Sequence, residues 1–518
     1  MSDEKIEVTE VSNNDAVAED ANQNAPQNKG PKSKFGKSLD KYFEISQRGS
    51  TIKQEIIGGV TTFFAMVYIM FVNPSTMSGQ GPDNAIWQAI FVATALGAIV
   101  GTLLMALYAK MPFAQAPGMG LNAFFCVSFM PSVIAVSQAD LEKGFHYGLS
   151  IIFVAGILFM ILSFTGIRKK IATSLPDSLK KAIPAGIGLF IAFIGFQNAG
   201  IITANDATLL QLADLHAYAY KTAAFNDLTG WYAIAPILVA FFGLLSIGLL
   251  SRTKKLNSFA VIASILGCTA LYYLFNINNP AVKIDKILSP ADTFTAFGKV
   301  GVGRAFLGFK YWEAGTILSI IMAIITFCLV DMFDTIGTLQ GTCAESGQLD
   351  QNGNPINMAK CMESDAIATV SGSIFGTSTV TTYVESAAGV SAGARTGLAS
   401  VITAALFFIT MFLTPLAQII PGAATAPALI YVGYLMLKNI KDVDMANPKA
   451  GIPAFLTLIM MPLTYSISNG IAIGMIAHTI MTVASIRSKE DAKAFFTKDI
   501  IVAILAILFI LRFFLVSM

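Results

Sequence analysis

The chain has 518 residues, of which 54% are apolar and only 13% are charged, and its mean hydropathy is +0.65. A soluble domain of this length needs far more charge to cover its surface, so the composition excludes a soluble globular protein. Most of residues 1–55 are polar, whereas long later stretches have no ionisable group, and the net charge of +2 is the sum over both regions. A net charge this small gives no sign of a nucleic-acid partner. Repeated apolar runs of about 20 residues predict an all-α polytopic membrane protein in contact with lipid.

The N-terminal segment is polar. Residues 1–34 are rich in Asp, Glu, Asn and Lys and lack the apolar core of a signal peptide. This composition is typical of a disordered tail, which we expect to occupy residues 1–50 and to lie in the cytoplasm. The first apolar helix is therefore expected to act as its own insertion signal.

Fourteen candidate spans follow along the chain. The first seven lie at about 54–73, 88–109, 117–132, 146–166, 182–202, 232–250 and 257–275. After a polar loop to about residue 313, seven more lie at about 314–338, 364–376, 379–393, 396–416, 419–438, 451–467 and 469–486. An extra C-terminal apolar helix at 499–517 either crosses the membrane or lies along its surface, and the sequence leaves both open.

Lysine and arginine gather in the loops on one side of this arrangement. They precede span one and follow spans four, six and twelve. Cytoplasmic loops of membrane proteins are enriched in these residues, so we expect the N-terminus in the cytoplasm of a bacterial cell. The basic segment 487–498 reaches the same side only if residues 451–486 cross twice, which supports the division into fourteen spans.

Spans three and ten are short, and each begins with an extended-looking piece. Prolines cause it at residues 112–117, and Thr and Val cause it at residues 377–384. Broken spans at matching places in two halves are the best sequence indication of a transporter's binding site. Seven spans per half is an odd number, so the second repeat must be inverted in the membrane.

Three acidic residues at membrane depth are candidates for substrate binding and proton coupling. Asp331 and Asp334 are three residues apart on span eight and share a face, and Glu385 belongs to span ten. A carboxylate at this depth costs about 2.5–3.5 kcal/mol, so it normally faces a cavity or a partner. It accepts two adjacent N–H groups of a purine, and burial favours its protonated form. The structural alternatives are that Asp334 caps the following Thr- and Gly-rich stretch, or that one aspartate pairs with Arg395 or a lysine.

Other residues of the broken spans also have two interpretations. Asn122 offers an amide that matches the edge of a purine ring, or it ties down the broken backbone. Gly118 and Gly120 let a ligand approach the main chain, or they allow close helix packing. Three aromatic side chains either stack on a flat base or serve only as packing: Tyr383, Phe124 and Phe125.

The remaining polar and sulfur-containing residues are given structural roles or none. Asp365 precedes an apolar stretch and is expected to be a plain helix N-cap. The five cysteines show no metal-ligand spacing and are interpreted as small buried apolar residues. The three histidines are isolated in the sequence (His146, His216 and His478). We therefore expect no metal site and no cofactor.

Several stretches resemble the AzgA-like purine permeases, a branch of the nucleobase:cation symporters related to uracil and xanthine permeases. They lie at 59–63, 68–74, 116–123, 188–195, 331–338 and 376–386. The motifs are long and occur in the right order, and the resemblance covers about residues 40–486.

The resemblance implies a fold of 14 spans arranged as two inverted seven-span repeats, as in uracil permease. Residues 51–166 and 314–416 would form a core domain, and residues 180–275 and 418–486 a gate domain. The substrate would lie between short strands of spans three and ten, and the two domains would move as an elevator. This branch typically transports adenine, guanine and hypoxanthine, and related carriers form homodimers.

The resemblance also carries site residues over to this chain. Asn122, Asp331, Asp334 and Glu385 match positions tied to purine binding or transport, and Tyr383 with Glu385 resembles the pair that holds the base in uracil permease. That permease has Glu and His in span eight, where this chain has two aspartates. The proton carrier therefore cannot be copied from it, and we favour Glu385 with Asp331 assisting.

Other functions need different residues. An anion or carboxylate carrier of the same architecture would prefer a neutral or basic site, which the three acids disfavour, and a uracil- or xanthine-type permease is a nearer alternative. A membrane enzyme needs a nucleophile and base or metal ligands, and a channel does not need two broken spans bearing acids. We therefore predict a proton-coupled symporter of the inner membrane that imports purine nucleobases, and not an enzyme.

Overall fold

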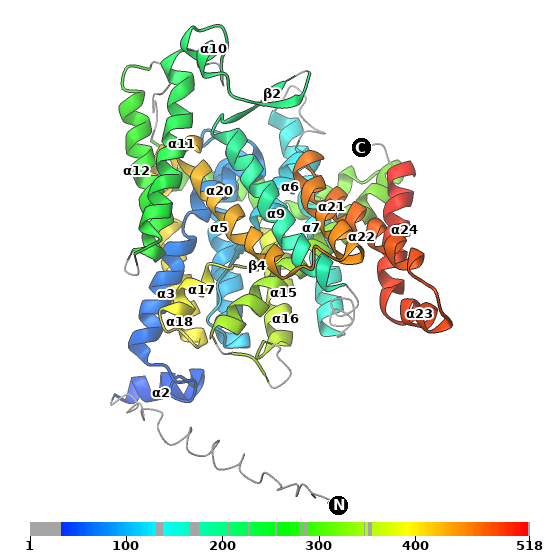
Figure 1. Ribbon diagram of the computed structural model, residues 1–518. Helices are drawn as coiled ribbons and strands as arrows, with labels where there is room; N and C mark the ends of the chain where they lie inside the picture. Colours follow the sequence, from blue (N-terminus) through cyan, green and yellow to red (C-terminus); the bar gives the residue numbers. More distant parts are fainter. Residues whose placement is uncertain are drawn as a thin grey trace, which may run out of the picture.

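The computed structural model describes residues 33–130, 138–165, 176–205, 207–225, 228–253, 256–279, 282, 287–346, 348–350 and 355–515. Residues 1–32, which are part of the predicted disordered tail, lie outside these ranges. The described helices form one bundle, with α2 (Lys34–Phe43) at one end of it (Figure 1).

Most helices of the first half overlap the predicted spans, although no helix was predicted at residues 215–219. The helices of this half are α3 (Ile52–Met66), α4 (Ile69–Ser78), α5 (Ala85–Leu104), the π-helix η1 (Met105–Ala109), α6 (Met119–Phe129), α7 (Gln138–Phe164), α9 (Asp177–Asn198), α10 (Leu215–Ala219), α11 (Trp231–Leu250) and α12 (Ala260–Phe275). The second half supplies α15 (Ile317–Ser346), α16 (Met358–Phe375), α17 (Ser386–Ser391), α18 (Gly397–Thr410), α19 (Thr414–Ile419), α20 (Gly422–Leu437), α21 (Pro448–Leu463), α22 (Ile467–Ala484), α23 (Lys489–Ala494) and α24 (Ile500–Leu515).

Within the described ranges, eight helices are long and apolar enough to cross a membrane. They are Ile52–Ser78, Ala85–Ala109, Asp140–Phe164, Asp177–Asn198, Trp231–Leu250, Asn257–Phe275, Ile317–Leu339 and Ile467–Ala484. Three shorter apolar helices, α18, α20 and α21, add to them. The chain is thus a multi-pass membrane protein, and the number of fourteen spans stays a prediction.

Two short strands pair side by side at the middle of the bundle. β1 (Gln115–Pro117) pairs antiparallel with β4 (Val380–Thr382), and Gln115 lies opposite Thr382. We call this place the β1–β4 crossing. Each strand leads into a short helix, α6 after β1 and α17 after β4. The prediction of short strands in spans three and ten is therefore confirmed. A second pair, β2 (Ile202–Asn205) with β3 (Leu209–Leu212), forms a hairpin that was not predicted.

The helices pack in two sets. In one set α5 contacts α4, α16 and α18, α3 contacts α17 and α18, and α7 contacts α16. In the other set α9 contacts α20 and α21, α11 contacts α12 and α20, and α21 contacts α22. The sets meet where α6 and α15 contact α9. A division into moving core and gate domains remains a prediction.

The expected disordered tail is wrong for residues 34–50. α2 begins after Ser33, whose hydroxyl accepts a hydrogen bond from the Gly36 amide, and the helix ends at Phe43. Phe43 and Ile45 are buried against Leu398 of α18. The apolar contacts hold this segment on the bundle, although the average composition of the segment is polar.

The expected polar loop before residue 313 is also wrong in part. Residues 290–311 contain α13 (Pro290–Ala296), the π-helix η4 (Phe297–Gly301) and α14 (Ala305–Gly308), which pack on α5 and α7. A Cβ on Gly308 would overlap the carbonyl oxygen of His146, so this contact requires glycine. The ring of His146 is itself bonded to the Val300 carbonyl at 3.2 Å, which gives this histidine a packing role.

The extra C-terminal helix packs on the bundle. α24 contacts α22 and α15, and the chain bends by 72° between residues 489–497 and 500–511. His478 Nε2 of α22 lies 3.1 Å from Asp499 Oδ1, just before α24 begins.

Candidate functional site

The site is built around the crossing of β1 and β4. Backbone bonds extend the pair at both ends, because the Gly118 amide donates to Thr379 O and the Tyr383 amide donates to Ala114 O, each at 3.0 Å. The pairing holds the start of α6 beside the segment that leads into α17. Two pieces of chain about 260 residues apart thus form one rigid centre.

Asn122 ties this centre together. Its fully buried amide nitrogen donates to Asn73 Oδ1 and to Pro117 O, and its oxygen accepts from the Ser378 hydroxyl. Asn73 in turn donates to Thr94 Oγ1 of α5 at 2.7 Å. The two N–H groups of Asn122 are therefore both used within the protein, as the structural interpretation of this residue requires.

Tyr383 and the two glycines shape the same region. The Tyr383 hydroxyl donates to the Pro117 carbonyl, which fastens β1 from the other side. A Cβ on Gly118 would lie 3.0 Å from Thr381 Cγ2, and one on Gly120 would lie 2.5 Å from Ile187 Cγ2 of α9. Gly120 therefore allows close packing between α6 and α9.

Two carboxylates beside the crossing are partly exposed. Glu385 Oε1 accepts a hydrogen bond of 2.7 Å from the hydroxyl of Tyr68, a buried residue between α3 and α4. Asp334 of α15 lies within electrostatic range of Glu385 and Asp365. Asp334 and Glu385 are less covered than Asp331 and Asp365, which makes them the better candidates for contact with a ligand.

Asp331 is placed differently, although it lies one turn from Asp334. Only 1% of it is exposed, and Asp331 Oδ2 accepts a hydrogen bond of 3.0 Å from Thr369 Oγ1 of α16. The Val380 amide donates to the same threonine hydroxyl at 3.2 Å. Asp331 thus supports β4 through Thr369. The Arg395 guanidinium donates to the backbone carbonyls of Val390 and Ala394, each at 2.7 Å.

The prediction that Asp365 is a helix N-cap is wrong. α16 begins at Met358, so Asp365 lies two turns inside the helix and is fully buried. Its carboxylate accepts hydrogen bonds from Gln115 Nε2 at 3.2 Å and from Thr335 Oγ1 at 2.8 Å. The polar residues before position 364 made the helix look shorter than it is.

Thr379 is a site residue that could not be selected from the sequence alone. Its hydroxyl is buried and has no hydrogen-bond partner in the part of the chain that the structure describes. The Thr379 hydroxyl oxygen lies close to Gly118, at 3.8 Å from the position that a Cβ on this glycine would take. A buried hydroxyl without a partner is costly, so a ligand bound here would satisfy it.

The candidate aromatic residues Phe124 and Phe125 are packing residues. Phe124 lies against Phe327 of α15 with ring centres 5.2 Å apart, and Phe125 lies against Phe129 at 5.3 Å. Within the described ranges, no cluster of His, Cys, Asp or Glu side chains is arranged to hold a metal ion.

A helical membrane bundle with two crossing broken spans and buried acids defines a membrane transporter. The sequence comparison makes this assignment specific. Residues 53–473 match the Permease family (Xan_ur_permease), and the chain belongs to this family of xanthine and uracil permeases. It is therefore a permease and not an enzyme.

Curated relatives confirm the resemblance to purine permeases. The guanine/hypoxanthine permease PbuG of Bacillus subtilis is 37% identical over 87% of this chain and 95% of its own length. The adenine permease AdeP of Escherichia coli is 36% identical over 92% of this chain and 95% of its own length.

Solved structures show the same fold at low sequence identity. The transmembrane domain of the cyanobacterial bicarbonate transporter BicA has a TM-score of 0.57 at 14% identity, covering 80% of this chain and 97% of that domain. The murine anion transporter Slc26a9, in its inward-facing state, has a TM-score of 0.58 at 12% identity, covering 93% of this chain and 77% of that chain. The likeness concerns the fold of a membrane transporter.

Proposed function

We propose that this permease is a proton-coupled symporter that imports the purine nucleobases adenine, guanine and hypoxanthine. The names of the curated relatives support purine bases as the substrate class. The observation that carries the proposal is the pair of partly exposed carboxylates, Glu385 and Asp334, beside the β1–β4 crossing.

The base is held by its edge in this proposal. Glu385 and Asp334 accept the adjacent N–H groups of the purine, and the free hydroxyl of Thr379 meets a ring nitrogen or carbonyl. Gly118 lets β4 pack closely against the main chain at this point, since a Cβ there would lie 3.0 Å from Thr381 Cγ2. Asn122 and Tyr383 fix the shape of the site by holding β1 in place.

Glu385 is the proposed proton carrier. The Tyr68 hydroxyl donates a hydrogen bond to the Glu385 carboxylate and so stabilises the charged form of Glu385. Uptake of a proton by Glu385 removes this charge, which couples the proton to the binding or release of the base. Asp331 is the proposed assisting group, one turn from Asp334 on α15. One proton moved inward gains about 2.3 kcal/mol per 100 mV, which supports roughly 50-fold accumulation of a neutral base.

The proposed movement is an elevator step in which one set of helices slides past the other. The contact of α6 and α15 with α9 is the surface that would slide, and Gly120 keeps it close. We place the carrier in the inner membrane as a homodimer with a cytoplasmic N-terminus. The basic residues around α2 and before α9 support this orientation.

Uptake into proteoliposomes tests the function. Radiolabelled adenine, guanine and hypoxanthine are supplied with and without an inwardly directed proton gradient, and with sodium in place of that gradient. We expect accumulation of purines only with the proton gradient. Accumulation driven by sodium overturns the proton coupling, and uptake of uracil, bicarbonate or a carboxylate without purine uptake overturns the substrate class.

A further inference from the structure

We propose that the corner formed by α2, η1 and the first turns of α16 binds a phospholipid with an anionic headgroup. The site lies outside the proposed transport pathway and does not depend on what the permease carries. It has an apolar groove for an acyl chain (Val100, Leu103, Leu104, Leu107 and Tyr108) and lysines for the headgroup (Lys41, Lys110 and Lys360). We call this set of residues the corner site.

The groove is shallow, apolar and open to the outside of a membrane-spanning helix. It has a volume of about 210 Å³ and is lined by α5 and η1. Leu107 is 46% exposed and Tyr108 is 42% exposed, so both side chains line it from the outside. The π-helical turn of η1 interrupts the regular packing of α5, and such turns are frequent at functional sites.

Two lysines stand at the end of this groove. Lys360 Nζ lies 5.8 Å from the ring centre of Tyr108, and the Tyr108 hydroxyl donates to Glu363 of the same α16 turn. Lys110 Nζ lies 5.0 Å from the ring centre of Tyr42 of α2. Aromatic rings beside lysines hold the ammonium groups near the plane where headgroups lie.

α2 has the properties of a helix that lies in the membrane surface. Lys34, Lys37 and Lys41 follow one stripe of the helix and are all exposed. Phe35, on another stripe seven residues before Tyr42, is 76% exposed although it is a large apolar side chain. Basic and apolar stripes side by side are typical of helices that bind anionic membranes.

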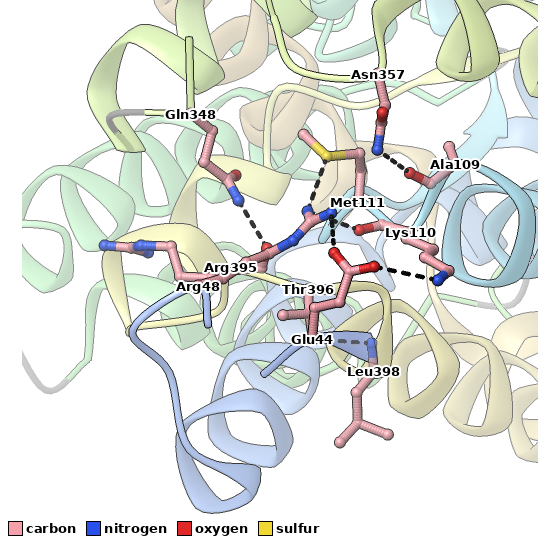
Figure 2. Close-up of polar contacts among 10 residues, drawn as sticks. All are labelled: Glu44, Arg48, Ala109, Lys110, Met111, Gln348, Asn357, Arg395, Thr396 and Leu398. Carbon is pink, nitrogen blue, oxygen red and sulfur yellow. Dashed lines mark hydrogen bonds and ion pairs between the residues drawn. The ribbon is translucent and has the colours of Figure 1, made fainter. Parts of the chain in front are cut away.

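The structure fastens α2 to the groove. The Tyr42 hydroxyl donates to Leu107 O at 3.3 Å. Glu44, just after α2, pairs with Arg48 at 3.3 Å and with Lys110 at 3.4 Å, while Arg48 also donates to Lys110 O at 3.1 Å (Figure 2). Asn357 Nδ2, before α16, donates to Ala109 O at 3.0 Å. The three elements therefore present one continuous surface.

Charge and shape together select the occupant. Residues 34–50, Lys110 and residues 358–364 together carry six basic side chains and three acidic ones, so the net charge of this corner is positive. The acidic residues are Asp40, Glu44 and Glu363. A free phosphate would use the lysines but not the groove, and a second copy of the chain would use the groove but not require the lysines. An anionic phospholipid uses both.

Native mass spectrometry of the purified full chain tests the proposal. The protein is supplied with phosphatidylglycerol, with phosphatidylcholine, or with glycerol phosphate alone, and retained lipid and thermal stability are measured. We expect retained phosphatidylglycerol and a raised unfolding temperature only with that lipid. Equal retention of phosphatidylcholine, or stabilisation by glycerol phosphate alone, overturns the proposal.

Matched variants locate the site. Lys41→Gln with Lys360→Gln should lower retention of phosphatidylglycerol roughly fivefold per lysine, whereas Lys489→Gln with Lys493→Gln on α23 should not. Leu107→Trp should fill the groove and displace the lipid. Its control is Leu245→Trp on α11, a residue that is 67% exposed. Unchanged lipid retention in the first pair or in Leu107→Trp contradicts the assignment, and a loss of dimers in Leu107→Trp without lipid loss assigns the groove to a second copy.

Discussion

Four buried or partly buried carboxylates lie near the β1–β4 crossing, and their surroundings separate them. Asp331 and Asp365 are covered and accept hydrogen bonds from neighbouring hydroxyl and amide groups. Asp334 and Glu385 are partly exposed. A covered carboxylate that accepts hydrogen bonds from a neighbouring helix holds the two helices together, and a less covered one is the better candidate for contact with a ligand. Substitutions at the two kinds of position should therefore have different effects.

Glu385→Gln should abolish accumulation driven by a proton gradient. Glutamine keeps the size of the side chain and can still bond Tyr68, but it cannot carry a proton. The measurement is uptake of labelled purine with and without the gradient, together with exchange of preloaded purine. The exposed Glu490 provides a control in Glu490→Gln. Gradient-driven accumulation at the wild-type level rules out the proposed coupling role.

Asp365→Asn should lower stability, while Asp334→Asn should weaken purine binding in a protein that remains stable. Asp365 is bonded to two side chains in the core, and an amide there faces the Gln115 amide donor-to-donor unless it turns. The expected cost for Asp365→Asn is about 1–3 kcal/mol. Thermal unfolding and purine binding are measured on both variants. A stable Asp365→Asn with weakened binding, or an unstable Asp334→Asn with normal binding, contradicts the separation into structural and ligand-binding acids.

Glu55 shows how a structural acid escapes a sequence analysis. Its fully buried carboxylate accepts hydrogen bonds from the backbone amides of Arg395 at 2.9 Å, Thr396 at 3.2 Å and Ala399 at 3.3 Å, at the start of α18. A cap that reaches across more than 300 residues has no local pattern. The sequence identified acids in the middle of apolar runs, but it could not tell which ones have partners.

At the scale of elements, the contact between α6 and α9 depends on Gly120. Gly120→Ala should slow transport, because its methyl group would meet Ile187 Cγ2 at 2.5 Å across the surface that is proposed to slide. Overpacking of this kind typically costs about 1–3 kcal/mol. The control is Gly248→Ala on α11, where nothing lies within 4 Å of the added Cβ. Equal uptake rates for the two variants would show that this contact does not limit movement.

The attachment of α2 should weaken in acid. Burial is the largest single influence on the pKa of Glu44 and raises it, but the hydrogen bonds and charges of Arg48 and Lys110 together outweigh burial and hold this pKa below its ordinary value. A lowered pKa means that the contribution to stability is present at neutral pH and is lost as the pH falls below the ordinary pKa range of glutamate. Because Glu44 is partly exposed, the effect is small. Hydrogen exchange of α2 should rise over this range in wild type and not in Glu44→Gln.

Element by element, the sequence predicted what long apolar runs and backbone breakers determine. Proline and glycine before α6, and threonine and valine before α17, revealed both strands of the crossing. Their register could not be predicted, because it depends on contacts such as Tyr383 with Pro117. α2, α13 and α14 were missed because each is short, at ten residues or fewer, and isolated helices of this length need packing on the bundle to stabilise them.

At the scale of the whole molecule, the two ends of the bundle should face different compartments. α2 and the β2–β3 hairpin lie at opposite ends (Figure 1). We expect a membrane-impermeant maleimide to label Thr208→Cys in intact cells and Lys37→Cys only after permeabilisation. Both positions are exposed, and the partly exposed Cys126 is replaced by serine in the background. Labelling of Lys37→Cys from outside would reverse the orientation.

The crossing of β1 with β4 also sets an order of events during biosynthesis. Tyr383 closes on Pro117 across 266 residues, so β1 leaves the ribosome long before its partner exists. At about 5–20 residues per second this wait lasts roughly 15–50 seconds. During that interval the half-made carrier has an unpaired strand edge inside the membrane. Premature termination anywhere before residue 380 therefore leaves a product that the insertion machinery must shield or a protease must remove.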